Sequence, residues 1–212
     1  MFTKTLSGDA QKSLAILGKN VLPKGTYMAG GSALALYFGH RISVDFDFFT
    51  PISFSSSDLA KKLNMLGKFK TQTALSDTLL GTFNDIKFSI FKYNYPLIFP
   101  TQNFLGIKLA HPEDIGAMKI AAIMDRGSKK DFIDLYFLSQ RGINLEECFN
   151  IYNKKYKALG NNLYSIITSL SYFVDAEVAE MPIMLLKVNW EEVKAFFRKE
   201  AVRLGKKYLQ NF

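Results

Sequence analysis

The chain has 212 residues, 48% hydrophobic and 22% charged, a balance that excludes an intrinsically disordered protein and allows one large or two small domains. Its 27 lysines and arginines exceed 19 aspartates and glutamates, and the net charge of +8 favours an anionic partner such as nucleic acid, nucleotide or a membrane surface. The single cysteine, Cys148, excludes an internal disulfide framework, and we expect a buried thiol. The N-terminus lacks a signal-peptide core and no apolar run is long enough to cross a bilayer, which predicts a cytoplasmic protein with no membrane partner.

The first half of the sequence alternates between strand and helix patterns. An amphipathic helix is expected within residues 1–20, with Leu14 and Leu17 facing inward, followed by an apolar strand over 26–29. Gly30-Gly31-Ser32 then breaks that strand and opens a helix over 33–38. The remaining elements are a strand over 43–49, a helix over 58–66 with Ser57 as its N-cap, strands over 78–83 and 86–91 around a turn at Asn84-Asp85, and a loop over 93–102.

From Pro112 onward the apolar residues repeat at helical spacing and no strand is predicted. The expected helices span residues 112–125, 129–140, 145–158, 161–174 and 190–208. This shift in pattern predicts an α+β protein with two parts. Residues 1–110 form a mixed β-sheet flanked by helices, and residues 111–212 form a helical domain that completes the site and carries basic surface.

Asp45 and Asp47 are the first candidates for chemistry. Residues two apart on a strand point to the same face, so the predicted strand presents both carboxylates together. The alternate residues are apolar and are expected to face the core: Val44, Phe46 and Phe48. Paired carboxylates suit Mg²⁺, which prefers hard oxygen ligands together with phosphate oxygens.

The Gly30-Gly31-Ser32 turn is the second candidate. A helix start exposes backbone N–H groups that suit a phosphate, and residues without a Cβ let a triphosphate approach closely. Either feature alone is more often a solvated strand face or an ordinary turn. Their order along the chain, with a strand before the glycines and a short helix before the aspartates, favours a site for phosphoryl or nucleotidyl transfer.

The stretch from Gly30 to Asp47 resembles the first motif of the AbiEii/AbiGii-type nucleotidyltransferases, in the polymerase-β-like superfamily. The residues that carry the resemblance are Gly30-Gly31-Ser32-Ala33-Leu34 and His40-Arg41-Ile42-Ser43-Val44-Asp45-Phe46-Asp47. The resemblance implies that Asp45 and Asp47 hold Mg²⁺ and that Gly30, Gly31, Ser32 and Arg41 bind the nucleotide. The family has a further acid in a later strand, and Ser89 stands at the matching position here.

Residues 114–134 resemble the later motifs of the same family. Asp114, Lys119 and Arg126 match its Asp…Lys…Arg pattern, which implies that Lys119 and Arg126 meet nucleotide phosphates. Asp131 and Asp134 match its DxxD motif and share a helix face, which implies that one of them is a general base or the missing acid. Without the resemblance, Lys119 would be read as a solvated lysine and residues 126–131 as a polar turn between helices.

Two stretches concentrate the positive charge in the helical half. One is Lys154-Lys155-Tyr156-Lys157. The other is the last helix, with an apolar stripe at Trp190, Val193, Phe197, Ala201, Leu204 and Tyr208 and basic residues largely off it at Lys194, Arg198, Lys199, Arg203, Lys206 and Lys207. Each stretch is either a solvated charged face or a surface that grips RNA phosphates.

These observations favour a Mg²⁺-dependent nucleotidyltransferase that moves a nucleotide from an NTP to RNA, tRNA or protein. The resemblance implies a toxin of a toxin–antitoxin or phage-defence system, with an antitoxin protein as partner. The alternative is a catalytically weakened nucleotide- or RNA-binding module that retains the fold, and Ser89 favours it. A helical adaptor for other proteins has only the aromatic-rich composition in its favour.

Overall fold

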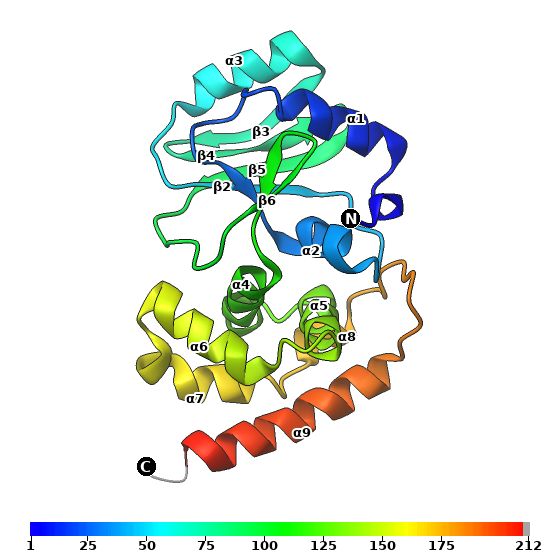
Figure 1. The fold of residues 1–212 in the computed structure, drawn as a ribbon, viewed down its shortest axis with the longest axis vertical. Coiled ribbons are helices and arrows are strands. Elements are labelled where there is room, and N and C mark those ends of the chain that lie inside the picture. Colours follow the sequence, from blue (N-terminus) through cyan, green and yellow to red (C-terminus); the bar gives the residue numbers. More distant parts are fainter. Residues whose placement is uncertain (210–212) are drawn as a thin grey trace. The chain divides into compact units, whose positions relative to one another are not determined.

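The computed structural model describes residues 1–209, and the chain divides into two compact units, Met1–His111 and Pro112–Phe212. Unit 1 is a mixed α/β structure and unit 2, as far as residue 209, is built from helices α4 to α9, which confirms the predicted fold class (Figure 1). None of the helices described is both long and apolar enough to cross a membrane.

Unit 1 is a seven-stranded mixed sheet in the order β3-β4-β5-β2-β1-β7-β6. Strand β2 lies at its centre, antiparallel to β1 and parallel to β5. The elements in chain order are a 3₁₀ turn at Thr3–Thr5, α1 (Gly8–Leu17), β1 (Tyr27–Met28), α2 (Gly30–Phe38), β2 (Phe46–Thr50), α3 (Ser56–Leu66), β3 (Phe69–Leu75), β4 (Thr78–Phe83), β5 (Ile86–Lys92), β6 (Gln102–Phe104) and β7 (Ile107–Leu109).

The sheet separates an apolar face from a more polar one because side chains alternate along each strand. Phe46 and Phe48 of β2 and Phe88 and Ile90 of β5 are almost completely buried on the apolar face. The residues between them, which include Asp47 and Ser89, therefore lie on the opposite face. The predicted turn joining β4 to β5 is confirmed, with Asn84 and Asp85 both in the left-handed region at φ 51° and 64°.

Unit 2 has helices α4 (Pro112–Asp125), α5 (Lys129–Gln140), α6 (Leu145–Tyr156), α7 (Leu159–Ser169), α8 (Val174–Glu177) and α9 (Trp190–Tyr208). The predicted bounds of α4, α5 and α9 are confirmed. Four members of the predicted α9 stripe are buried: Val193, Phe197, Ala201 and Leu204. The helix expected over 161–174 is wrong at its end, because the chain turns after Ser169 and the Phe173 ring packs on Phe132 and Trp190.

Three predictions for unit 1 are corrected. Strand β2 begins at Phe46 rather than residue 43, so Asp45 precedes the strand, and Val44 is 42% exposed instead of facing the core. The N–H of Ser43 donates to the carbonyl oxygen of Thr5, which diverts this segment from the sheet. The N-cap of α3 is Ser55, not Ser57, and strands β6 and β7 were not predicted.

Candidate active site

Asp47 lies at the centre of the polar sheet face of unit 1. It is half-buried in β2, and the parallel register places it opposite Ser89 of β5. The Ser89 hydroxyl donates a hydrogen bond of 2.8 Å to Asp47 Oδ1. Ser89, which stands where the family has a further acid, therefore contacts the Asp47 carboxylate directly.

Asp45, unlike Asp47, lies outside the sheet. It lies in the segment before β2 and is half-buried, so the strand ladder does not orient its carboxylate. The prediction that both aspartates lie within one strand is therefore wrong for Asp45, which immediately precedes β2. Asp45 still precedes Asp47 by two residues, at the entrance to the same strand.

The start of α2 lies directly against Asp47. The Ala29 N–H donates to the Asp47 carbonyl oxygen at 3.0 Å, and Gly30 follows in the left-handed region at φ 71°. A Cβ on Gly30 would lie 2.8 Å from Asp47 Oδ2, closer than such atoms pack. Glycine thus lets the first N–H groups of α2, which have no partner within the helix, lie beside the carboxylate.

Arg41 and Ser32 complete this arrangement. A Cβ on Gly31 would lie 2.0 Å from Arg41 Nη2, so the guanidinium lies over the Gly31 backbone. Arg41 is 3% exposed, and its Nη1 also donates to the Ile42 carbonyl oxygen at 3.2 Å. The Ser32 hydroxyl donates to the Ser43 hydroxyl at 3.0 Å. The predicted residues Gly30, Gly31, Ser32, Arg41 and Asp47 therefore gather at one place in unit 1.

The remaining predicted residues gather in unit 2, at the junction of α4 and α5. Lys119 Nζ lies 2.7 Å from Asp131 Oδ1 and 2.7 Å from Asp134 Oδ2. Arg126 Nε donates to Asp131 Oδ2 at 3.1 Å. The Ser128 hydroxyl donates to the same oxygen at 2.6 Å, so Ser128 contacts Asp131 through its side chain instead of capping α5 with it.

These contacts fix the charge state of Asp131. Burial alone would raise the pKa of its carboxyl group, but the Lys119 charge and the hydrogen bond from Arg126 outweigh burial and lower the pKa to about 2. Asp131 is 1% exposed and is therefore a buried anion near neutral pH. A carboxylate with so low a pKa is a weak proton acceptor, which disfavours Asp131 as a general base.

Comparison with known proteins identifies the family to which the chain belongs. The family described as "Nucleotidyl transferase AbiEii toxin, Type IV TA system" matches residues 14–204. The chain belongs to the AbiEii nucleotidyltransferase toxin family. An uncharacterised protein of Aquifex aeolicus is 41% identical to it, covering 87% of this chain and 88% of that protein. As a member of this family, the chain is a transferase enzyme that acts on nucleotidyl groups.

Solved structures share the fold of this AbiEii family member. MenT4, a nucleotidyltransferase toxin of Mycobacterium tuberculosis, has a TM-score of 0.62 at 16% identity, covering 92% of this chain and 81% of its own. JHP933 of Helicobacter pylori has a TM-score of 0.58 at 19% identity, covering 97% and 96% of the two chains. The nucleotidyltransferase-type fold predicted from the sequence is confirmed.

Some of the basic residues that the sequence places on the surface of the AbiEii chain are buried or paired with acids, and these are not free to bind an anionic partner. Lys155 is wholly buried and pairs with Asp114 at 3.0 Å, so it belongs to the interior of unit 2 and not to a basic surface. Burial lowers the pKa of Lys155, although the Asp114 charge opposes that change. This pair was not predicted, because Asp114 lies on α4 and Lys155 on α6, and their contact depends on how the two helices pack.

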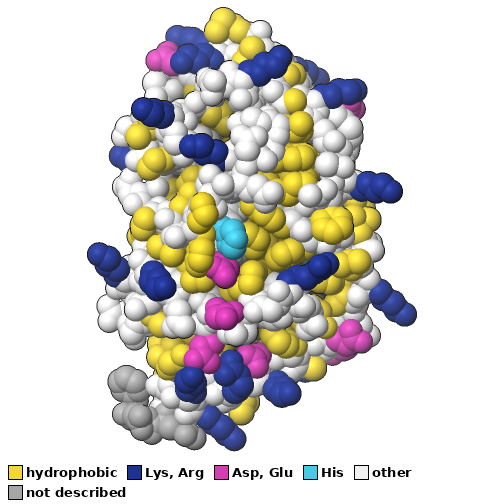
Figure 2. All heavy atoms as spheres, in the orientation of Figure 1, with side chains coloured by type: hydrophobic (Ala, Val, Ile, Leu, Met, Phe, Trp, Pro, Cys, Tyr) yellow, Lys and Arg dark blue, Asp and Glu magenta, His cyan; other side chains and the backbone are white. Residues whose placement is uncertain are grey.

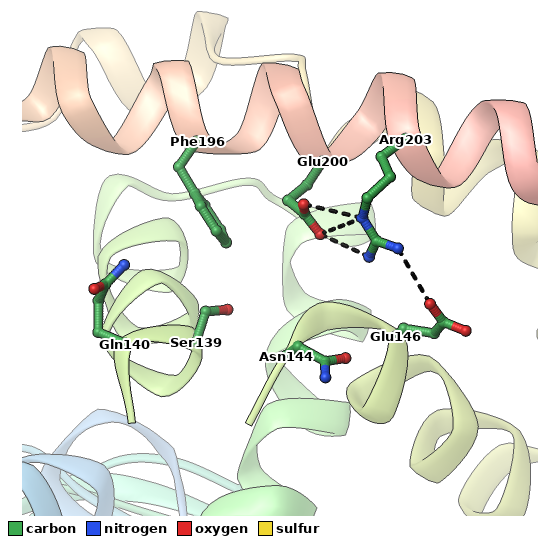
Figure 3. Close-up of a pocket in the computed structure, with 7 residues that line it drawn as sticks. All are labelled: Ser139, Gln140, Asn144, Glu146, Phe196, Glu200 and Arg203. Carbon is green, nitrogen blue, oxygen red and sulfur yellow. Dashed lines mark hydrogen bonds and ion pairs between the residues drawn. The ribbon is translucent and has the colours of Figure 1, made fainter. Parts of the chain in front are cut away.

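Helix α9 has a similar mixture of charges. Lys194 is 8% exposed and pairs with Glu177 and Glu191, contrary to its predicted place on the solvated face. Arg203 pairs with Glu200 of the same helix at 2.8 Å and with Glu146 of α6 at 3.2 Å (Figure 3). All three side chains line a cavity of about 350 Å³ between α5, α6 and α9. Acidic side chains lie beside basic ones over the helices of unit 2 in Figure 2. Lys199 and Lys206 are exposed and make no ion pair with any residue in the range 1–209.

Proposed function

We propose that the chain transfers a nucleotide from an NTP to a hydroxyl group of an RNA acceptor, with Mg²⁺, and that it acts as the toxin of a toxin–antitoxin pair. The observation that carries the proposal is the start of α2, held so close to Asp47 that a Cβ on Gly30 would lie 2.8 Å from Oδ2. A carboxylate beside helix N–H groups that have no partner within the helix offers a metal ligand and a phosphate site in one place.

The chemistry of the residues present fits Mg²⁺. Asp45 and Asp47 offer carboxylate oxygens, and Mg²⁺ is commonly bound by one or two carboxylates together with substrate phosphates and waters. Within residues 1–209 there is no cluster of three or more His, Cys, Asp or Glu side chains that could hold a metal, so substrate oxygens would complete the coordination. When bound, Mg²⁺ supplies charge that stabilises the oxygens around the reacting phosphorus.

The chain's own groups bind and orient the triphosphate. The N–H groups at the start of α2 and the Arg41 guanidinium over Gly31 face the phosphates. The acceptor hydroxyl attacks the α-phosphorus and loses its proton, a new P–O bond forms, and the bond to the bridging oxygen breaks as pyrophosphate leaves. Ser89 keeps Asp47 oriented through its hydrogen bond of 2.8 Å.

Lys119 is held in place by its two aspartates, whose negative charges together exceed its single positive charge. Asp131 and Asp134 each lie 2.7 Å from Lys119 Nζ, so the ammonium is fixed rather than free to turn. Arg126 is the more exposed cation of the group, with 65% of its side chain accessible. The low pKa of Asp131 supports a positioning role for it, and Asp134, which is buried and pairs with the same ammonium at 2.7 Å, shares that role.

A nucleotide-binding module without turnover is the second candidate, and Ser89 is the observation that favours it. A serine cannot supply the negative charge of a third carboxylate. The test that separates the two uses [α-³²P]NTPs, Mg²⁺ and separate pools of RNA and protein. The proposal expects labelled RNA with wild type and none with Asp45→Asn. NTP binding by calorimetry without any labelled product would support the module instead.

A further inference from the structure

We propose that an aromatic row beside Asp47 stacks the bases of a single-stranded segment of the RNA acceptor. The row consists of Phe91, Phe49, Tyr93 and Tyr95. The proposal rests on the proposed function, since it supplies the acceptor subsite of that reaction. The members of the row follow from the register of unit 1, in which Phe49 and Phe91 are paired two residues along the strands from Asp47 and Ser89.

The strand register gives the row its position. Side chains two apart on a strand share a face, so Phe49 lies on the face of Asp47, and Phe91 lies on the face of Ser89. The Tyr93 N–H donates to the Thr50 carbonyl oxygen at 2.8 Å, which extends the pairing of β2 with β5 beyond Lys92. The row therefore begins beside the candidate metal ligand and continues past the end of β5, which lies next to β2 in the sheet (Figure 1 shows the two strands).

The rings contact one another in sequence. The centroids of Phe91 and Phe49 lie 6.1 Å apart, those of Phe49 and Tyr93 5.1 Å, and those of Tyr93 and Tyr95 5.0 Å. The first three are half-buried and Tyr95 is 46% exposed, so the row runs from the site toward solvent. At its inner side the row is anchored by the buried Tyr27, whose ring stacks on Phe49 at 5.8 Å.

The length and the charges of the row favour a nucleic acid strand over the base of one NTP. A single base needs one ring, whereas the rings of this row succeed one another over several residues. Lys87, on the same face of β5 as Ser89, is exposed, and so is Lys24, whose carbonyl oxygen accepts a hydrogen bond from Thr50 at the end of β2. Aromatic rings with nearby cations are the usual means of binding single-stranded nucleic acid, and an acidic or apolar protein segment would not need both.

The test measures binding without NTP or Mg²⁺, at one fixed salt concentration. The full-length protein is titrated into a labelled single-stranded oligoribonucleotide of mixed sequence and into the same sequence as a duplex. Tyr95→Ala and Phe91→Leu remove rings, and Tyr164→Ala is the matched control, because Tyr164 is 68% exposed on a helix of unit 2. Circular dichroism establishes that each variant is folded.

We expect wild type to prefer the single strand and each row variant to weaken that binding about five-fold or more, as is usual for loss of one base–aromatic contact. Tyr164→Ala and the NTP affinity of the row variants should change less than about two-fold. Row variants that bind the single strand like wild type, or that lose NTP affinity instead, would overturn the proposal. So would a wild type that does not bind the single-stranded oligonucleotide. A protein that binds the strand through the row but transfers no nucleotide would overturn the proposed function alone.

Discussion

Asp131 offers the sharpest test of the buried charge cluster in unit 2. Its carboxylate is 1% exposed and accepts from Lys119 at 2.7 Å, Arg126 at 3.1 Å and Ser128 at 2.6 Å. Asp131→Asn removes the negative charge and leaves the buried Lys119 with one of its two aspartates, Asp134. Breaking a buried pair in this way costs about 3–5 kcal/mol, and the second aspartate favours the lower end. At about 3 kcal/mol, a chain of this size loses about 6–12 °C in Tm.

The pH dependence of the free energy of unfolding gives a second estimate of what the Asp131 charge contributes to stability. The pKa of Asp131 falls from 3.8 to about 2 on folding, which corresponds to about 2 kcal/mol of stability near neutral pH. Because the folded-state pKa is the lower one, this stability is present above 3.8 and is lost as pH falls toward 2. About half of it remains at about pH 3, so the difference between wild type and variant should narrow by about 1 kcal/mol between about pH 6 and pH 3.

Urea denaturation followed by circular dichroism at several pH values measures both effects. Asp125→Asn is the matched control, since Asp125 is an exposed acid at the end of α4. The reasoning is refuted if Asp131→Asn is as stable as Asp125→Asn, or if the loss of stability is the same at every pH.

Three further predictions concern single residues. Gly30→Ala should abolish nucleotidyl transfer and cost about 1–2 kcal/mol of stability, because its φ is 71° and the new Cβ would meet Asp47; Gly8→Ala, with open space around it, should do neither. Ser89→Ala should cost about 1 kcal/mol and raise the Mg²⁺ concentration needed for half-maximal transfer; an unchanged requirement would contradict its positioning of Asp47. Cys148 is buried with a pKa raised by burial to about 12, so a thiol reagent should label it only in denaturant, and rapid labelling of the native protein would show the packing to be wrong.

Helix α9 illustrates what a sequence pattern predicts well. The stripe of apolar residues at steps of three and four gives its bounds, and burial of Val193, Phe197 and Leu204 follows from the same spacing. Which of the basic residues of α9 are paired with acids could not be predicted from the same pattern. Arg203 and Lys207 both reach Glu146, a residue far away in sequence, so their neutralisation depends on how α6 and α9 pack.

In the candidate active site, too, some features were predictable from the sequence and others were not. The glycines and Asp47 were predictable because their residue types and order carry the chemistry. The late start of β2 was not, because the hydrogen bond from Ser43 to Thr5 involves a segment with no strand pattern of its own. Strands β6 and β7 escaped prediction because each has only three residues, joined by Leu105 and Gly106 at positive φ. The aromatic row also depends on register, which a single strand sequence does not give.

Release of pyrophosphate tests the central claim most directly. The protein is incubated with each NTP, Mg²⁺ and RNA, and pyrophosphate is measured together with the nucleotide incorporated. We predict that wild type releases one pyrophosphate for each nucleotide transferred. In Asp47→Asn, which keeps the size of the side chain, the rates of pyrophosphate release and of nucleotide transfer should both fall by at least about 100-fold. Equal release by wild type and Asp47→Asn would contradict the assignment of this site.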